Sequence, residues 1–347
     1  MLRVFVSPSS EARQRWAWES IAPHCRTSEV LLLAPSRGAA DDFLRRNATG
    51  ILGVHRYSVS QFAAGLASSE LAERGLTVAT HLGREALAAR AIFSERRNLE
   101  YFAAVADTPG FSRAAASTLN ELRLAGITPA QLETAGTAGR DLARILARYV
   151  EQLRDKQLAD QAVVLEIAAA RIAAGGVPVL WLDVRPASRR ERELLEALAG
   201  DAPTIAATAL TGDEDSVRWL TGLAGSPPEI DEGPGNTSLL RVRRFVFTYE
   251  ENAPAEPDAT LDFFSAAGEA LESAEIARRV RKLASSGTPF DHIAVLLRQP
   301  DAYAPLLEDA FRRAGIPAYF TQGALRPDPA GRALLALIDC ALEKLPA

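Results

Sequence analysis

Short apolar runs alternate with helical patterns in the N-terminal part of the chain. Apolar runs at 2–6 and 30–34 each end in turn residues, and residues with helical spacing follow at 11–21 and 39–46. A third short strand is expected at 50–54, with a further helix behind it. Short buried strands that alternate with helices are typical of a parallel sheet covered on both faces, so this pattern predicts an α/β fold.

The pattern changes between residues 77 and 175. Ala, Leu, Arg and Glu recur there at helical spacing, and runs of β-branched residues are scarce. The segment 128–131 (Thr-Pro-Ala-Gln) has the form of a capping box with proline at the first helical position, and Gly126 is suited to end the helix before it. We expect an all-helical subdomain inserted into the α/β fold.

The α/β pattern then resumes. Strands are expected at 177–183 and 204–208, on either side of a helix that opens with a capping box at 188–191. The pattern from 211 to 260 is mixed. We place a lobe boundary in its last part, an acidic stretch with prolines at 250–258.

A second α/β unit follows this boundary. Strands are expected at 261–265, 293–297 and 317–321, with helices between them and a final helix over 330–345. Three strands make a thin sheet for such a unit, so we expect this lobe to be incomplete.

The chain therefore divides into four expected segments. Residues 1–76 and 176–248 are the two parts of a first lobe, 77–175 is a helical insertion, and 261–347 is a partial second lobe.

Composition excludes several classes of protein. A chain of 347 residues corresponds to two or three domains, and 48% hydrophobic with 24% charged residues is close to the globular average, which excludes a disordered or fibrous chain. The net charge of −5 excludes a protein that coats nucleic acid by bulk charge, although it allows a local basic groove.

Cysteine content and hydropathy indicate whether the chain binds metal, contacts a membrane or is exported. Two cysteines, Cys25 and Cys340, are too few for a zinc or iron–sulfur site, so we expect no metal site. The chain shows neither an apolar stretch of membrane-spanning length nor a signal peptide, so we expect a cytoplasmic protein without membrane contact.

The turn after the first strand is the natural place for a phosphate-binding loop, because a helix N-terminus presents free N–H groups there. Aligned with the pattern GxxxxGK[ST], residues 7–14 read Ser-Pro-Ser-Ser-Glu-Ala-Arg-Gln. Ser7 and Ala12 replace the glycines, Arg13 replaces the lysine, and Gln14 replaces the hydroxyl residue. As a nucleotide site the loop is degenerate.

Two further residues of this loop act against phosphate binding. Pro8 removes one N–H donor, and Glu11 adds a negative charge. The alternative, which the sequence alone favours, is an ordinary strand-to-helix turn with a serine cap.

Asp183 ends an expected strand, at the place where nucleotide hydrolases hold magnesium. The next residue is Val184, so no acidic base stands beside it to activate water. The alternative is a turn or cap residue. No catalytic residue is assigned.

Other candidates lie at the ends of strands, where open parallel sheets bind ligands. Ser36 and Arg37 are suited to hold a nucleic-acid phosphate, although Ser36 is equally suited to cap a helix. Tyr57 is either a base-stacking residue or a half-buried aromatic, and Arg298 either faces an anion or is simply solvated.

The order of these segments resembles that of the UvrD-like helicases, and most closely the AddB-type subunit of ATP-dependent nucleases that carry a PD-(D/E)XK nuclease. In the C-terminal part the resemblance rests on 263–266, 272–277 and 293–298. Upstream, 33–37 is similar to motif Ia of the family, 57–62 to its next DNA-contacting motif, and 108–123 to its helical subdomain.

The resemblance implies two RecA-like lobes of the P-loop-NTPase type, the second incomplete, with the helical subdomain inserted into the first. It implies that Ser36, Arg37 and Tyr57 contact single-stranded DNA, and that Arg298 faces the terminal phosphate of a nucleotide. Ser7, Ser10, Ala12, Arg13, Gln14 and Asp183 would be the remains of the nucleotide site. Nuclease residues would lie in a longer polypeptide.

The function implied is that of a degenerate, DNA-binding helicase region in double-strand break repair and recombination. An AddA-like helicase–nuclease subunit would be its partner, and ATP with magnesium would act in the parent complex rather than in this chain. Two alternatives remain open: an active ATP-dependent helicase of the UvrD type, and a protein-interaction scaffold without DNA contact.

Overall fold

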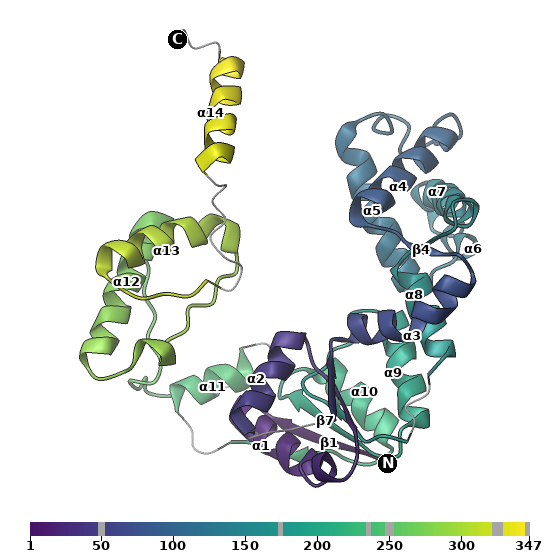
Figure 1. The fold of residues 1–347 in the computed structure, drawn as a ribbon. Coiled ribbons are helices and arrows are strands. Elements are labelled where there is room, and N and C mark those ends of the chain that lie inside the picture. The colour runs from purple at the N-terminus through teal and green to yellow at the C-terminus, as the bar shows by residue number, and fades with distance from the viewer. Residues whose placement is uncertain (48–52, 173–175, 234–236, 247–252, 321–328, 344–347) are drawn as a thin grey trace. The chain divides into compact units, whose positions relative to one another are not determined.

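The structure, a computed structural model, describes residues 1–47, 53–172, 176–233, 237–246, 253–320 and 329–343. The chain contacts divide it into two compact units, Met1–Thr260 and Leu261–Ala347, and each is described by itself (Figure 1).

A parallel sheet of six strands lies at the centre of the first unit. Its order is β3-β2-β6-β7-β1-β8, and each neighbouring pair runs parallel. The strands are β1 Leu2–Ser7, β2 Val30–Leu33, β3 Val54–Tyr57, β6 Val179–Trp181, β7 Ile205–Leu210 and β8 Glu229–Ile230. The α/β fold that the apolar runs predict is confirmed.

One strand lies later in the chain than expected. The third strand spans Val54–Tyr57 rather than 50–54, and residues 48–52 lie outside the described part of the chain. Val54–Tyr57 lies at the edge of the sheet and is only half buried, so it can carry the polar residues His55 and Arg56. Because of these residues the strand is not an apolar run, which is the pattern used to predict strands.

Helices cover both faces of the sheet, as side-chain alternation along the strands requires. Val30 and Leu32 of β2 pack in one cluster with α1 (Ser10–Ile21) and α2 (Arg37–Asn47). Leu31 and Leu33 face the other way. They join β6 and β7 in a cluster covered by α3 (Val59–Glu73), α8 (Gln161–Ala170), α9 (Arg189–Asp201) and α10 (Glu214–Ala224).

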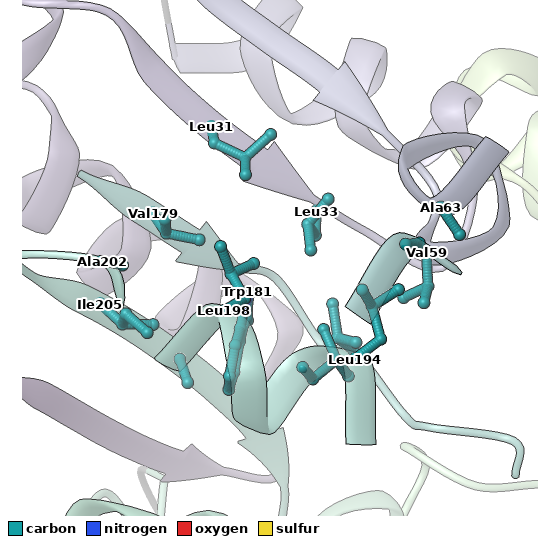
Figure 2. Packing of buried hydrophobic residues seen from close by; sticks show 14 of the residues in the cluster. Leu31, Leu33, Val59, Ala63, Val179, Trp181, Leu194, Leu198, Ala202 and Ile205 are labelled. Atoms are coloured by element: carbon teal, nitrogen blue, oxygen red, sulfur yellow. The ribbon is translucent and has the colours of Figure 1, made fainter. Parts of the chain in front are cut away.

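Figure 2 shows this second cluster, in which Trp181 of β6 lies among Leu194 and Leu198 of α9. Trp181 is 1% exposed, and its ring stacks on that of Trp219 with centroids 5.8 Å apart. Together these groups bury a continuous apolar surface, which is the main source of stability in such a fold.

The chain between α3 and β6 is mostly helical and has a hydrophobic core of its own. Its helices are α4 His81–Glu95, α5 Pro109–Leu124, α6 Pro129–Leu132, α7 Gly136–Asp155 and α8. The expected cap at 128 is present, because the backbone N–H of Thr128 donates to Oε1 of Gln131 at 2.9 Å. The expectation of helices alone was wrong, since β4 (Thr77–Val78) pairs with β5 (Leu158–Ala159). That this part is an inserted subdomain stays a prediction.

Two buried carboxylates hold this helical part together. Both oxygens of Asp141 accept backbone N–H groups from the 100–102 segment, with Oδ2 taking Tyr101 N at 2.9 Å. Asp160 caps α8 through Val163 N and pairs with Arg123 of α5, its Oδ2 lying 2.9 Å from Nε. Because both carboxylates are buried, these bonds offset the cost of removing charge from water.

The second unit contains α12 (Glu269–Ser285), α13 (Pro300–Ala314) and α14 (Pro329–Glu343), while α11 (Ser238–Phe245) belongs to the first. Helices α12 and α13 share a small core that includes Val280, Leu307 and Phe311.

The expected strands of the second unit do not form among its described residues. The segments 261–265, 293–297 and 317–320 form neither helix nor strand, and residue 321 lies outside the described part. Ile293, Val295 and Leu297 still turn toward the core, as the alternation predicts. An apolar alternation fixes which side chains turn inward, whereas a strand also needs a neighbouring backbone to complete its hydrogen bonds.

Tyr149 of α7 gives the fold a testable pH dependence. Burial, together with the nearby charge of Asp160, raises the pKa of Tyr149 to about 12, whereas an unfolded tyrosine titrates near pH ~10. Between these values the folded state holds a proton that the unfolded state has lost, so the free energy of unfolding falls as the pH rises. We expect Tyr149→Phe to remove this part of the alkaline loss, as measured by urea unfolding at increasing pH.

The matched control is Tyr101→Phe, because the Tyr101 side chain is 64% exposed. It should leave the alkaline slope of the wild-type protein unchanged. Equal slopes for wild type and Tyr149→Phe would contradict the assignment.

Candidate functional site

The carboxyl ends of β1, β6 and β7 bring together two residues that the sequence places 170 positions apart, Arg13 and Asp183. Arg13 lies in the first turns of α1, just after β1, and Asp183 follows β6. Nε of Arg13 donates to Oδ1 of Asp183 at 2.8 Å, and Nη2 donates to Oδ2 at 3.0 Å. The pair is therefore bidentate, the strongest geometry for these two groups.

Other groups complete the coordination of this pair. Nη1 of Arg13 donates to the backbone carbonyl of Ser7 at 2.6 Å. The hydroxyl of Thr208, on β7, donates to Oδ1 of Asp183 at 2.8 Å and accepts the Asp183 backbone N–H at 2.9 Å. These bonds hold Asp183 at a φ of 51°, a left-handed conformation that aspartate adopts more readily than most residues.

The pair satisfies its own charges. The side chain of Arg13 is 8% exposed and that of Asp183 is 30% exposed. Both carboxylate oxygens of Asp183 already accept protein donors, so a magnesium ion would have to displace Arg13 to reach them. Val184 is 4% exposed and apolar, so the position beside Asp183 offers no general base.

The loop before α1 is closed by its own serines. The buried Ser7 donates its hydroxyl to Oδ2 of Asp231 at 2.9 Å and accepts Ser9 N at 3.0 Å. Ser9 caps the helix by accepting Ala12 N at 3.3 Å, so the expected serine cap is present one residue before Ser10. Two of the N–H donors that a phosphate would use here, those of Ser9 and Ala12, are occupied by side chains.

The remaining residues of the loop do not add free donors toward the pair. Ser10 accepts Nε2 of Gln14 at 3.2 Å along the side of α1, and Ala12 is buried. Thr208 and Asp231 are part of the site although the sequence did not single them out, because an isolated threonine or aspartate carries no motif.

A pocket of about 410 Å³ opens beside the pair, and its lining includes Arg13, Asp183, Arg185 and Asp213. Nε of Arg185 lies 2.7 Å from Oδ2 of Asp213, so a second ion pair stands near the first. Two cations and two anions leave no excess positive charge, which a nucleotide polyphosphate requires.

The DNA candidates lie along the same sheet edge, after the neighbouring strands β2 and β3. Leu33 of β2 pairs with Tyr57 of β3, so the residues that follow β2 lie beside Tyr57. Ser36 caps α2 by accepting Ala39 N at 3.1 Å, which is the cap role left open above. Arg37 is exposed, and within the described part of the chain its side chain makes no ion pair or hydrogen bond.

Tyr57 is half buried and its ring centroid lies 6.2 Å from that of Phe62, so part of the ring is used in packing and part remains accessible. The structure thus brings Ser36, Arg37 and Tyr57 to one edge. Their contact with DNA stays a prediction.

Arg298 is exposed and lies in the second unit, whereas the other candidates lie in the first. Its role also stays a prediction. Among the described residues, no group of three or more His, Cys, Asp or Glu side chains is placed to hold a metal ion.

Two curated proteins share sequence with most of this chain. The chain is 27% identical over 378 aligned residues to the B subunit of the ATP-dependent helicase/deoxyribonuclease of Moorella thermoacetica, covering 90% of this chain and 31% of that protein. It is 26% identical over 336 residues to the protein of the same name from Symbiobacterium thermophilum, covering 83% and 28%. The chain is similar to AddB-type subunits. No family model matches it.

This similarity supports the AddB-like family that the motifs indicate. The chain spans about a third of the length of these relatives. In the described part of the chain, no helix is both long and apolar enough to cross a membrane.

The ion pair can be tested by a double-mutant cycle. Asp183→Asn keeps the left-handed backbone and the size of the side chain but leaves the buried Arg13 charge unpaired, so we expect a loss of about 3 kcal/mol in the free energy of unfolding. Adding Arg13→Met should cost less than the sum of the single changes, because the unpaired charge is then removed. Urea unfolding followed by tryptophan fluorescence measures this, since Trp16, Trp18, Trp181 and Trp219 all lie in the first unit.

The control is Asp215→Asn on α10, which removes an exposed pair with Arg218. It should change the free energy of unfolding by less than about 0.5 kcal/mol. Additive losses in the cycle would show that Arg13 and Asp183 are not coupled.

Proposed function

We propose that this chain is the DNA-contacting, helicase-like region of an AddB-like subunit, and that it does not itself hydrolyse ATP. It would hold one DNA strand in double-strand break repair and recombination, while a partner subunit supplies the motor. In this proposal the work is done in the cytoplasm, where chromosomal DNA lies.

The loss of ATP hydrolysis is supported above all by the Arg13–Asp183 pair. In a working site the cation at the Arg13 position reaches the outer phosphates and the acid at the Asp183 position holds magnesium-bound water. Here each group is bound by the other at 2.8 Å and 3.0 Å, so neither is available. The residues present therefore do not fit a magnesium–nucleotide complex.

DNA contact is supported by the edge formed by β2 and β3. An exposed guanidinium at Arg37 stands at the carboxyl end of a parallel sheet, beside an aromatic ring at Tyr57. Arginine for the phosphate and an aromatic ring for the base are the two kinds of group that bind single strands. In a chain of net charge −5 such contacts have to be local.

The names of the relatives support the wider setting. Both are B subunits of an ATP-dependent helicase/deoxyribonuclease. We infer that an AddA-like subunit is the partner and that it binds the ATP and magnesium that the complex consumes.

The DNA contact predicts a specific salt effect. Arg37→Ala should weaken binding of a labelled single-stranded oligonucleotide, and it should reduce the slope of log affinity against log salt by about 0.7, because one phosphate contact is lost. Fluorescence anisotropy at several salt concentrations measures both quantities, and Tyr57→Ala should weaken binding without changing the slope.

The control is Arg46→Ala, since Arg46 lies on the same helix, is exposed and makes no ion pair within the described chain. Equal binding by Arg37→Ala, Tyr57→Ala and this control would remove the proposed DNA edge, and no binding by the wild-type chain would favour a protein scaffold. DNA-stimulated ATP turnover that disappears in Asp183→Ala would establish an active helicase instead.

A further inference from the structure

A second polar pocket lies in the helical part of the first unit, between α4 and α5. Its volume is about 380 Å³. The polar side chains that line it are His81, Arg84, Glu85, Arg113, Ser117 and Asn120. None of these residues was expected in a site from the sequence.

Arg84 brings a charge into this pocket that the protein does not neutralise. Its side chain is half buried, and Nη1 donates to Oδ1 of Asn120 at 2.7 Å. Within the described residues no carboxylate forms an ion pair with it. An amide oxygen carries no net charge, so the hydrogen bond orients the guanidinium without cancelling its charge, and a partly desolvated cation favours an anion nearby.

Arg113 adds a second cation that is only loosely held. Its side chain is 82% exposed, and its Nε lies 3.8 Å from Oε1 of Glu85. The same oxygen lies 3.6 Å from Nδ1 of His81, so Glu85 is shared between two side chains and binds neither at short distance. With His81 neutral, Arg84, Arg113 and Glu85 leave a net charge of +1.

In two other pockets of the first unit most of the lining arginines form ion pairs, Arg13 and Arg185 in one and Arg123 and Arg190 in the other. Beside Asp183 the cations and anions balance, as described above. A pocket between α7 and the start of α6 is lined by three arginines, of which Arg123 pairs with Asp160 and Arg190 with Glu166 and Glu193. Arg84 differs from these four paired arginines, because the side chain that binds it is a neutral amide.

We propose that the pocket between α4 and α5 binds a phosphate group, and that the phosphodiester backbone of a DNA strand supplies it. The proposal rests on the DNA-binding function proposed above. Two guanidinium groups present planar sets of N–H donors, which match phosphate oxygens, and the Asn120 amide adds a neutral donor at the same wall. The helical part of the chain then contacts the strand, in addition to the sheet edge at Arg37.

The test is binding of a fluorescein-labelled single-stranded oligonucleotide, measured by anisotropy over a range of salt concentrations. Arg113→Ala should weaken binding about three- to tenfold and reduce the salt slope by about 0.7, as expected for one lost phosphate contact. Arg113→Lys should restore most of the slope because it restores the charge. Because the Arg113 side chain is exposed, its removal leaves the packing intact.

Arg84→Gln is the second variant, because glutamine can still donate to Asn120 while it removes the charge. It should lower the affinity and the slope as Arg113→Ala does. The matched control is Arg90→Ala, a change at an exposed arginine of the same helix that makes no ion pair in the described part of the chain. This control should bind DNA as the wild-type chain does.

The outcomes separate this inference from the function on which it rests. If Arg37→Ala weakens binding while Arg113→Ala and Arg84→Gln bind like Arg90→Ala, the pocket is not a DNA contact and the proposed function stands. If the wild-type chain does not bind the oligonucleotide, both fail. Calorimetric binding of inorganic pyrophosphate that is lost in Arg113→Ala, with DNA binding unchanged, would identify a free polyphosphate as the ligand and overturn the DNA backbone as its source.

Discussion

The buried ion pair between Arg13 and Asp183 is the interaction on which the centre of the structure depends. It joins the first helix to β6 directly, to β1 through the Ser7 carbonyl, and to β7 through the Thr208 hydroxyl. Taking two charges out of water costs free energy, and only bidentate geometry with additional hydrogen bonds offsets that cost. The pair stabilises the strand ends and, by the same bonds, satisfies its own two charged groups.

The sheet edge therefore has two parts with different capacities. At β1, β6 and β7 the polar groups bind one another and the charges balance. At β2 and β3, Arg37 remains exposed beside Tyr57, and in the helical part Arg84 and Arg113 keep a positive excess. A chain of net charge −5 can contact a polyanion only where cations gather locally, and in the proposed function Arg37, Arg84 and Arg113 supply them.

The sequence predicted the sheet well where the strands are central and less well at its margins. Val30–Leu33 is buried along its whole length, so its apolar run is continuous and easy to recognise. The edge strand Val54–Tyr57 carries His55 and Arg56, and its polar side chains displaced the prediction by several residues. In the second unit the strand expected at 293–297 does not form among the described residues, although Ile293, Val295 and Leu297 pack against the core.

By itself, the sequence determined the strand–helix order, the helix caps and the loss of the phosphate-loop residues, because each of these depends on neighbours within a few positions along the chain. Only the tertiary structure decided that Asp183 binds Arg13, that Thr208 and Asp231 complete the site, and that Arg84 binds the amide of Asn120. Those partners lie far apart in the chain, and no local pattern encodes them. Their charges are paired or unpaired according to which strand ends and helices the folded core places side by side.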